Sequence, residues 1–245
     1  MSKQNREQNR TERAAAVRAE AARKDRNRKV GLAVMIVVIL GAVVAAGVWA
    51  SNGSGTTTPI THVAVAAGDG TVVVGKATAP VKITIYEDFL CPYCRELEES
   101  TRDYLRQNAA DGKVQVTYHP INLLTATTYS ARALNAWAAV LKHGTPQQAL
   151  TLHDLFYDNQ PYESDADSTT NADIAKLVAR SGATNSAVTS ALSVTDTAFL
   201  TAANQAMATA NVTGTPTIYL NGKQLPAAAV SDLVSQIEKA VDAAS

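Results

Sequence analysis

Valine-rich and alternating stretches predict short β-strands in two separate parts of the chain. Residues 71–75 contain a run of valines, and residues 81–86 and 113–119 alternate apolar with polar side chains. A period of two is typical of a strand that buries one face. Residues 214–222 form a fourth candidate, which ends in an Asn-Gly pair that favours a tight hairpin turn.

A helix is expected directly after the second strand, over residues 93–108. These residues are strong helix formers, and Asp111-Gly112 supplies a stop signal. Glu96, Glu98 and Glu99 lie early in this segment, where negative charge favours the helix dipole. A short segment with polar and aromatic residues joins the second strand to this helix.

Helical patterns also fill the long interval between the third and fourth strands. Turn residues divide this interval into four segments, at residues 129–143, 146–158, 172–180 and 196–211. A last amphipathic helix has one apolar stripe, formed by Val230, Leu233, Val234, Ile237 and Val241. The order β-α-β, helices, β-β-α indicates an α/β fold with a helical insertion at about residues 122–211.

An uncharged apolar segment at residues 30–50 predicts one N-terminal transmembrane helix. At about 1.5 Å per residue it would span roughly 31 Å, close to the ~30 Å hydrocarbon core of a bilayer. A cleaved signal peptide is the alternative, because Val48-Trp49-Ala50 offers small residues at a cleavage position. The apolar stretch exceeds the roughly 7–15 residues of such a peptide, so an uncleaved anchor is favoured.

The formal net charge of zero hides a strong asymmetry between the two sides of this segment. Residues 1–29 carry ten Lys or Arg and four Asp or Glu, whereas residues 51–245 carry twelve and eighteen. The positive-inside rule then predicts a cytoplasmic basic tail at 1–29, a flexible linker at 51–64 and an extracytoplasmic domain at 65–245. A solvated topology signal explains the basic tail, so no nucleic-acid partner is expected.

The chain contains two cysteines, Cys91 and Cys94, separated by two residues. A disulfide between them would close a very short loop and so would restrict the unfolded chain very little. Structural stabilisation is therefore a poor reason for this pair, and redox chemistry is a better one.

The sequence around the cysteines resembles the thioredoxin superfamily. The motif Cys91-Pro92-Tyr93-Cys94 follows a strand, and Gly214-Thr215-Pro216 opens a late strand. The helical block between the two groups of strands resembles the DsbA-like branch, that of membrane-anchored bacterial thiol–disulfide oxidoreductases. Three short sequence segments resemble this branch as well: Glu87-Asp88-Phe89-Leu90 before the motif, Tyr118-His119-Pro120, and Val212-Thr213 before Gly214. The resemblance covers roughly residues 65–243 and implies a thioredoxin-like fold.

Other uses of a Cys-x-x-Cys motif fit this chain less well. Zinc sites need about four ligands, and haem attachment requires His directly after the second cysteine, where Arg95 stands. A glutaredoxin would lack the helical insertion and the outward topology. The four histidines are scattered without ligand spacing: His62, His119, His143 and His153. No metal and no cofactor is expected besides the redox-active Cys91–Cys94 disulfide.

The resemblance assigns a role to each residue of the motif. Cys91 is expected at the helix N-terminus, where unpaired N–H groups stabilise a thiolate, with Pro92 in the first turn. Cys94, one turn inward, is expected to be the shielded resolving thiol, and Tyr93 separates the two cysteines. Thr215 and Pro216 would form a cis-proline loop that binds the substrate chain.

The chain departs from this family pattern at one position. Many relatives have a buried acid six residues before the first cysteine, which exchanges a proton with the resolving thiol. Ile85 occupies that position here. Glu87 or Asp88 could relay the proton instead, and both could equally be solvated residues at a strand end.

The expected function is that of an extracytoplasmic oxidase that forms disulfides in secreted or membrane proteins. Its partners would be reduced or unfolded secreted proteins, a quinone-linked membrane re-oxidase and the membrane itself through residues 30–50. A reductase or isomerase of the same fold is the first alternative. A non-enzymatic binding module or carrier of a thiol-bound metal is the second, and the two intact cysteines argue against it.

Overall fold

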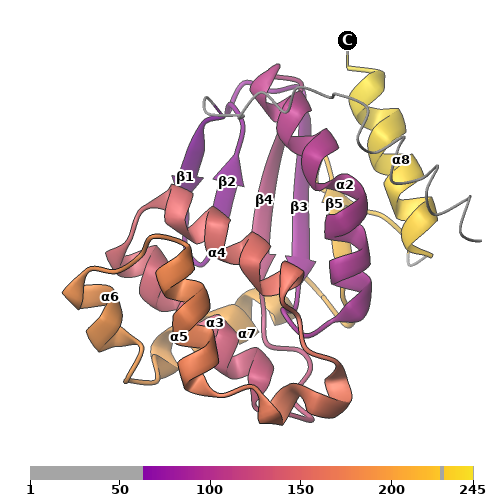
Figure 1. Cartoon of the computed structure of the whole chain (residues 1–245). Coiled ribbons are helices and arrows are strands. Elements are labelled where there is room, and N and C mark those ends of the chain that lie inside the picture. The colour runs from indigo at the N-terminus through magenta and orange to yellow at the C-terminus, as the bar shows by residue number, and fades with distance from the viewer. Residues whose placement is uncertain (1–62, 227–228, 245) are drawn as a thin grey trace, which may run out of the picture. The chain divides into compact units, whose positions relative to one another are not determined.

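A six-stranded sheet organises the part of the chain that the computed structural model describes, residues 63–226 and 229–244 (Figure 1). The strands lie in the order β1-β2-β4-β3-β5-β6. Their bounds are β1 Val65–Ala67, β2 Val72–Val74, β3 Val81–Glu87, β4 Val114–Pro120, β5 Thr217–Leu220 and β6 Lys223–Gln224. The four strands expected from the sequence are present, and β1, which the pattern did not single out, adds an edge strand.

The two central strands, β3 and β4, are parallel and define the edge where the motif lies. They pair from Val81 with Val114 to Glu87 with Pro120, and α2 connects them. Because the strands are parallel, their carboxyl ends meet at one edge of the sheet. Burial alternates along both strands, so one face is covered and the other is half-buried. Glu87 is the last buried residue of β3, and Cys91 follows it by four positions.

Seven α-helices and one short 3-10 helix accompany the sheet in the described part of the chain. Their bounds are α2 Pro92–Ala110, α3 Tyr129–His143, α4 Pro146–Asp158, η1 Glu163–Ser168, α5 Asn171–Arg180, α6 Ser186–Ala191, α7 Thr197–Thr209 and α8 Val230–Asp242. Helices α2 and α8 pack on each other, and α2 also contacts β4 and α4. Helices α3 to α7 lie between β4 and β5 in the chain, as the predicted insertion requires (Figure 1).

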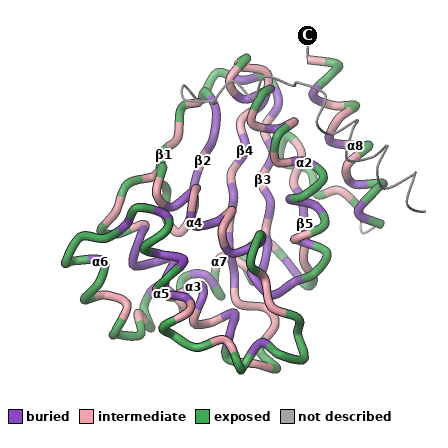
Figure 2. The backbone as a smooth tube through the Cα atoms, in the orientation of Figure 1, coloured by how far each residue is buried: buried purple, intermediate pink, exposed green. Residues whose placement is uncertain are grey.

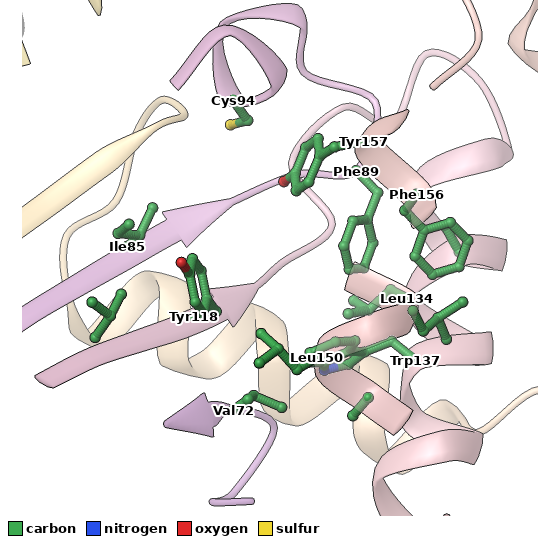
Figure 3. Packing of buried hydrophobic residues seen from close by; sticks show 14 of the residues in the cluster. Val72, Ile85, Phe89, Cys94, Tyr118, Leu134, Trp137, Leu150, Phe156 and Tyr157 are labelled. Atoms are coloured by element: carbon green, nitrogen blue, oxygen red, sulfur yellow. The ribbon is translucent and has the colours of Figure 1, made fainter. Parts of the chain in front are cut away.

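The insertion has its own aromatic core, which is continuous with the core of the sheet. Trp137, Leu152 and Phe156 are fully buried, whereas Leu141 and Leu155 are only partly buried. Phe89, which follows β3, packs against Phe156 with the rings tilted and their centroids 4.6 Å apart (Figure 3). Figure 2 shows that buried residues follow the central strands and the inner side of α3 and α4. The loop that carries Cys91 is thus anchored in both halves of the fold.

The predicted hairpin turn also forms, and it is tied to the central sheet. Asn221 and Gly222 both have positive φ angles, 50° and 79°, which a two-residue hairpin of this kind requires. The Asn221 side chain accepts a hydrogen bond of 2.8 Å from the backbone N–H of Lys82 in β3. This contact fixes the end of β5, the strand that begins just after Pro216.

Within residues 63–226 and 229–244, no helix is both long enough and apolar enough to span a bilayer. The predicted transmembrane helix at 30–50, the basic tail at 1–29 and most of the linker at 51–64 lie outside the described residues.

Candidate active site

Cys91 lies in a tight turn between β3 and α2 and forms the N-cap of that helix. Its backbone N–H donates to the Asp88 carbonyl at 2.9 Å, and its own carbonyl accepts from the N–H groups of Cys94 and Arg95. Pro92 occupies the first turn of α2, where its missing N–H leaves no bond unmade. Cys91 therefore lies at the N-terminus of α2, as the sequence predicted.

Both cysteines are free thiols, and both are buried. Cys91 is 4% exposed and Cys94 is 1% exposed. Exposure therefore does not distinguish the two thiols in this conformation. The Cys91 thiol donates to the Thr215 carbonyl at 3.2 Å, and this contact with the neighbouring loop covers it.

The two thiols differ strongly in acidity. A hydrogen bond from the Cys94 thiol lowers the pKa of Cys91 to about 7, with further help from Thr215 and the N–H groups of Cys94 and Tyr93, although burial opposes the shift. Burial raises the pKa of Cys94 well above its usual value, and the adjacent Cys91 and Glu87 charges add to this effect. At neutral pH, the pair is therefore a partial thiolate at Cys91 beside a neutral thiol at Cys94.

The loop before β5 places Thr215 and Pro216, the predicted substrate-binding residues, against the turn that carries Cys91. The Thr215–Pro216 peptide bond is cis, as expected. A groove of about 550 Å³ runs from this loop toward α8, and Tyr93, which is 62% exposed, stands at its rim. The groove is lined by Tyr93, Glu96, Thr213, Gly214, Thr215, Pro216, Thr217, Ile218, Gln224, Leu225, Pro226, Ala229, Val230 and Leu233. The predicted residues Cys91, Pro92, Tyr93, Thr215 and Pro216 thus gather at one place.

The insertion contributes a residue that the sequence analysis missed. The Gln160 side chain donates from Nε2 to the carbonyls of Phe89, at 3.1 Å, and Cys91, at 3.0 Å. Gln160 follows α4 and lies 69 positions from Cys91, so no local pattern could have indicated the contact. Through Gln160, the insertion therefore hydrogen-bonds to two carbonyls of the turn that carries Cys91.

The two acids before the motif have very different surroundings, and neither is solvated. Both oxygens of the Asp88 carboxylate are occupied: Oδ1 accepts from Leu90 N–H and the Ser130 hydroxyl, and Oδ2 accepts from the N–H groups of Leu123 and Leu124. Asp88 therefore joins the end of β3 to the start of the insertion.

Glu87 instead contacts a histidine, and only one of its two carboxylate oxygens has a hydrogen-bond partner among the described residues. Its Oε1 lies 2.7 Å from Nε2 of His153 in α4, while its Oε2 is buried and has no hydrogen-bond partner among the described residues. Glu98 of α2 completes a group whose candidate ligand atoms all lie within 4.8 Å of one another. Glu98 was expected to offset the helix dipole, but the first turn of α2 contains no acidic residue and the Glu98 side chain is fully buried.

One sequence signal could have revealed Glu98, but none could have revealed its partner. Cys94 and Glu98 are four positions apart, so they share one face of α2, the face that also buries Leu105. His153 lies 66 positions from Glu87, and only the packing of α4 brings them together. Arg102 lies 3.5 Å from Glu98 Oε2, so a positive charge already accompanies these carboxylates without a metal ion.

Comparisons with known proteins agree with this geometry. Residues 68–239 match the model of a protein family described as Thioredoxin. The disulfide bond oxidoreductase DsbG from Mycobacterium tuberculosis is 25% identical with a TM-score of 0.59, over 73% of this chain and 94% of that chain. DsbA from the same organism is 24% identical with a TM-score of 0.58, over 71% and 97%.

A curated relative has a different overall organisation. The serine/threonine-protein kinase PknE of Mycobacterium tuberculosis is 29% identical over 187 residues, which cover 70% of this chain and 33% of the kinase. This chain thus spans about a third of the kinase's length. The predicted fold class, an α/β fold with a helical insertion, is confirmed by the family match and the solved structures.

Proposed function

Because the chain belongs to the thioredoxin family and has the fold of the DsbA-like thiol–disulfide oxidoreductases, we propose that it exchanges its Cys91–Cys94 disulfide with thiols of other proteins. The difference in acidity between the two thiols is the observation that carries this proposal. Cys91 has a pKa of about 7, whereas the pKa of Cys94 is raised by burial. A thiol that ionises near neutral pH is both a good nucleophile and a good leaving group.

The exchange proceeds through a mixed disulfide at Cys91. A substrate thiolate attacks the Cys91 sulfur, and the bond from Cys91 to Cys94 breaks. A second substrate thiolate then attacks the first substrate sulfur, so the substrate leaves oxidised and Cys91 leaves as a thiolate. The N–H groups at the start of α2 and the Cys94 thiol stabilise that anion.

The groove beside the motif supplies a binding place for the substrate chain. Thr215 and Pro216 border it directly next to Cys91, and Leu225 and Val230 give it an apolar wall. An extended peptide can pair with the backbone near Thr215 and place an apolar side chain in the groove. Such contacts suit reduced or unfolded secreted proteins, which expose apolar segments together with free thiols.

Oxidation of clients is the direction we propose, on the outer side of the membrane. The charge-free segment at 30–50 and the basic tail at 1–29 support an anchor with the catalytic domain outside the cytoplasm. Stabilisation of the Cys91 thiolate makes the reduced form more stable and the disulfide more oxidising. Each cycle leaves the enzyme reduced, so we propose a quinone-linked membrane partner that re-oxidises it.

Reduction or isomerisation of disulfides is the second candidate, and a specific observation favours it. The residue after Pro92 is Tyr93, which has no imidazole to add positive charge beside Cys91. The Cys91 pKa of about 7 is close to the value of ~7 for thioredoxin and well above the ~3.5 for DsbA. The redox equilibrium of the Cys91–Cys94 pair with glutathione separates the two directions.

Trapping of mixed disulfides tests the proposed chemistry. Since the chain has two cysteines, Cys94→Ser leaves one thiol, and any disulfide-linked adduct must form at Cys91. We expect Cys94→Ser to accumulate adducts with client proteins that a reductant releases. Cys91→Ser is the matched control and should form none and transfer no disulfide. Equal adduct formation by both variants, or by neither, would contradict the proposal.

A further inference from the structure

The groove beside the motif has one charged side chain among the described residues that line it, the carboxylate of Glu96. The other lining residues are apolar, aromatic, hydroxyl, amide or glycine residues, and none of them is a lysine or an arginine. Arg95 and Lys223 are next to lining residues in the sequence, but neither lines the groove. The groove therefore offers a single negative charge to a bound chain.

The Glu96 carboxylate is available to a ligand, unlike the two other carboxylates at the start of α2. Glu96 is exposed, and its side chain has no hydrogen bond or ion pair with the described residues. Glu98 is fully buried, and Glu99 accepts from Arg95 Nε at 2.9 Å. The cation next to Glu96 in the sequence is thus already paired, and Glu96 is left to pair with a cation from outside.

Tyr93 places an aromatic ring beside this carboxylate. Tyr93 and Glu96 are three positions apart on α2, so their side chains are neighbours on one face of the helix, and both line the groove. Tyr93 is 62% exposed and is one of three large hydrophobic side chains that the described residues expose. A cation is attracted to the face of an aromatic ring and pairs with a carboxylate. The two side chains together suit an ammonium or a guanidinium group.

The distance of Glu96 from Cys91 determines where on the client this cation must lie. Five positions at the start of α2 separate the two Cα atoms by roughly 8–9 Å. An extended chain advances ~3.3 Å per residue, so this distance corresponds to about two or three residues of the client. A residue two positions from the client's reacting cysteine has its side chain on the same face of the extended chain as the cysteine.

The charge of the whole domain favours the same class of client. Residues 51–245 carry twelve Lys or Arg and eighteen Asp or Glu, a formal charge of −6. A negative domain attracts cationic chains before contact, and salt screens this attraction. The long-range attraction does not depend on where the basic residue lies in the client, whereas a contact with Glu96 does.

We propose that Tyr93 and Glu96 form a cation subsite, which binds a lysine or arginine side chain two or three residues from the reacting cysteine of the client. The apolar wall with Leu225 and Val230 binds an apolar side chain of the same segment. Segments with an acidic residue at that position are poor substrates. This inference rests on the proposed function and deepens it, because it names the class of thiols that the Cys91–Cys94 disulfide oxidises.

Oxidation of peptides by the full-length oxidised protein tests the subsite. The probes are two-cysteine peptides that differ only in one residue, Lys, Gln or Glu, two positions from the first cysteine. One set carries this residue before the cysteine and a second set carries it after the cysteine. A further peptide has the composition of the Lys peptide, with the lysine moved about eight positions away. The second-order rate constant is measured under single-turnover conditions.

The wild type should distinguish these peptides by the charge near the cysteine. In one of the two sets, the Lys peptide should react about fivefold faster than the Gln peptide, and the Glu peptide should react more slowly than both. The peptide with the distant lysine should gain less than about twofold over the Gln peptide, because only the long-range attraction remains.

Variants of Glu96 separate the subsite from the intrinsic reactivity of the peptides. In Glu96→Gln, the ratio of the Lys to the Gln rate constant should fall from about five to about one. In Glu96→Lys, the Glu peptide should become the faster one. Asp103→Asn is the matched control, because it removes another exposed carboxylate of α2 that does not line the groove, and it should keep the wild-type ratio. Comparing one ratio between enzymes cancels the reactivity of the peptide thiols.

Tyr93→Leu tests the part of the ring in the same way. It removes the aromatic face and keeps the carboxylate, so the ratio should fall to about two. Because the ratio compares two peptides on one enzyme, a change in the reduction potential of this variant cancels. An unchanged ratio would exclude the ring from the subsite.

The outcomes separate the subsite from the proposed function. An equal ratio in the wild type and in Glu96→Gln would overturn the subsite, as would an equal fall in Asp103→Asn. If the wild type still oxidises the peptides in that case, the proposed function stands without the subsite. Failure of the wild type to oxidise any peptide would overturn both.

Discussion

Cys91 and Cys94 lie one helical turn apart, and the protein gives their thiols opposite acid–base behaviour. Both side chains are buried, so exposure does not separate them. The pKa of Cys91 is lowered because its thiolate receives hydrogen bonds, whereas the pKa of Cys94 is raised because the sulfur is enclosed by protein. This asymmetry depends on the shape of the cysteine turn, and Gln160 holds two carbonyls of that turn.

Replacing Gln160 tests this dependence. Gln160→Met keeps the length of the side chain and removes the donor to the Phe89 and Cys91 carbonyls. We expect the free energy of unfolding to fall by about 1–3 kcal/mol, because partly buried acceptors lose their hydrogen bond. Urea unfolding measures the loss, and Gln147→Met, on the exposed side of α4, is the control. An unchanged stability in Gln160→Met would mean that the turn is held by other contacts.

At the scale of elements, local signals predicted most of the fold, and long-range packing decided the rest. The expected helices at 129–143 and 146–158 coincide with α3 and α4, because apolar spacing and turn residues mark their ends. Strand β1 and helix α6 were not predicted, because they have 3 and 6 residues, too few for a clear period. His153 could not be paired with Glu87 because the contact depends on how α4 packs against the end of β3.

This contact between α4 and β3 should make stability depend on pH. The folded protein raises the pKa of His153 from 6.5 to about 10. Its contribution to stability is therefore fully present below about pH 6.5 and is lost as pH rises toward 10. The oxidised form is the one to measure, because neither cysteine titrates in it.

We expect the unfolding free energy of the oxidised protein to fall by about 2 kcal/mol between pH 7 and pH 9. In His153→Gln the slope over this range should be nearly flat, while His143→Gln should retain the wild-type slope. Urea unfolding at the two pH values provides the comparison. Parallel slopes in the wild type and in His153→Gln would show that the imidazole does not carry the effect.

At the scale of the whole molecule, we expect residues 30–50 to remain as a membrane anchor. The apolar span matches a bilayer and is flanked by basic residues, so the chain should be found uncleaved in the membrane fraction, with its N-terminal residues attached. Intact-mass analysis of membrane and soluble fractions measures this. A mature protein that begins at Ser51 and is free in the medium would contradict the anchor.

The redox equilibrium of the Cys91–Cys94 pair with glutathione tests the central claim most directly, because it reports whether the pair cycles and in which direction it works. The full-length protein is equilibrated over a range of reduced and oxidised glutathione ratios, and the fraction of free thiols is counted by labelling and mass. We predict a reduction potential of roughly −130 to −210 mV, between ~−120 mV for DsbA and ~−270 mV for thioredoxin. A potential near that of thioredoxin would contradict the oxidase and leave a reductase, and a pair that does not equilibrate at all would contradict disulfide exchange.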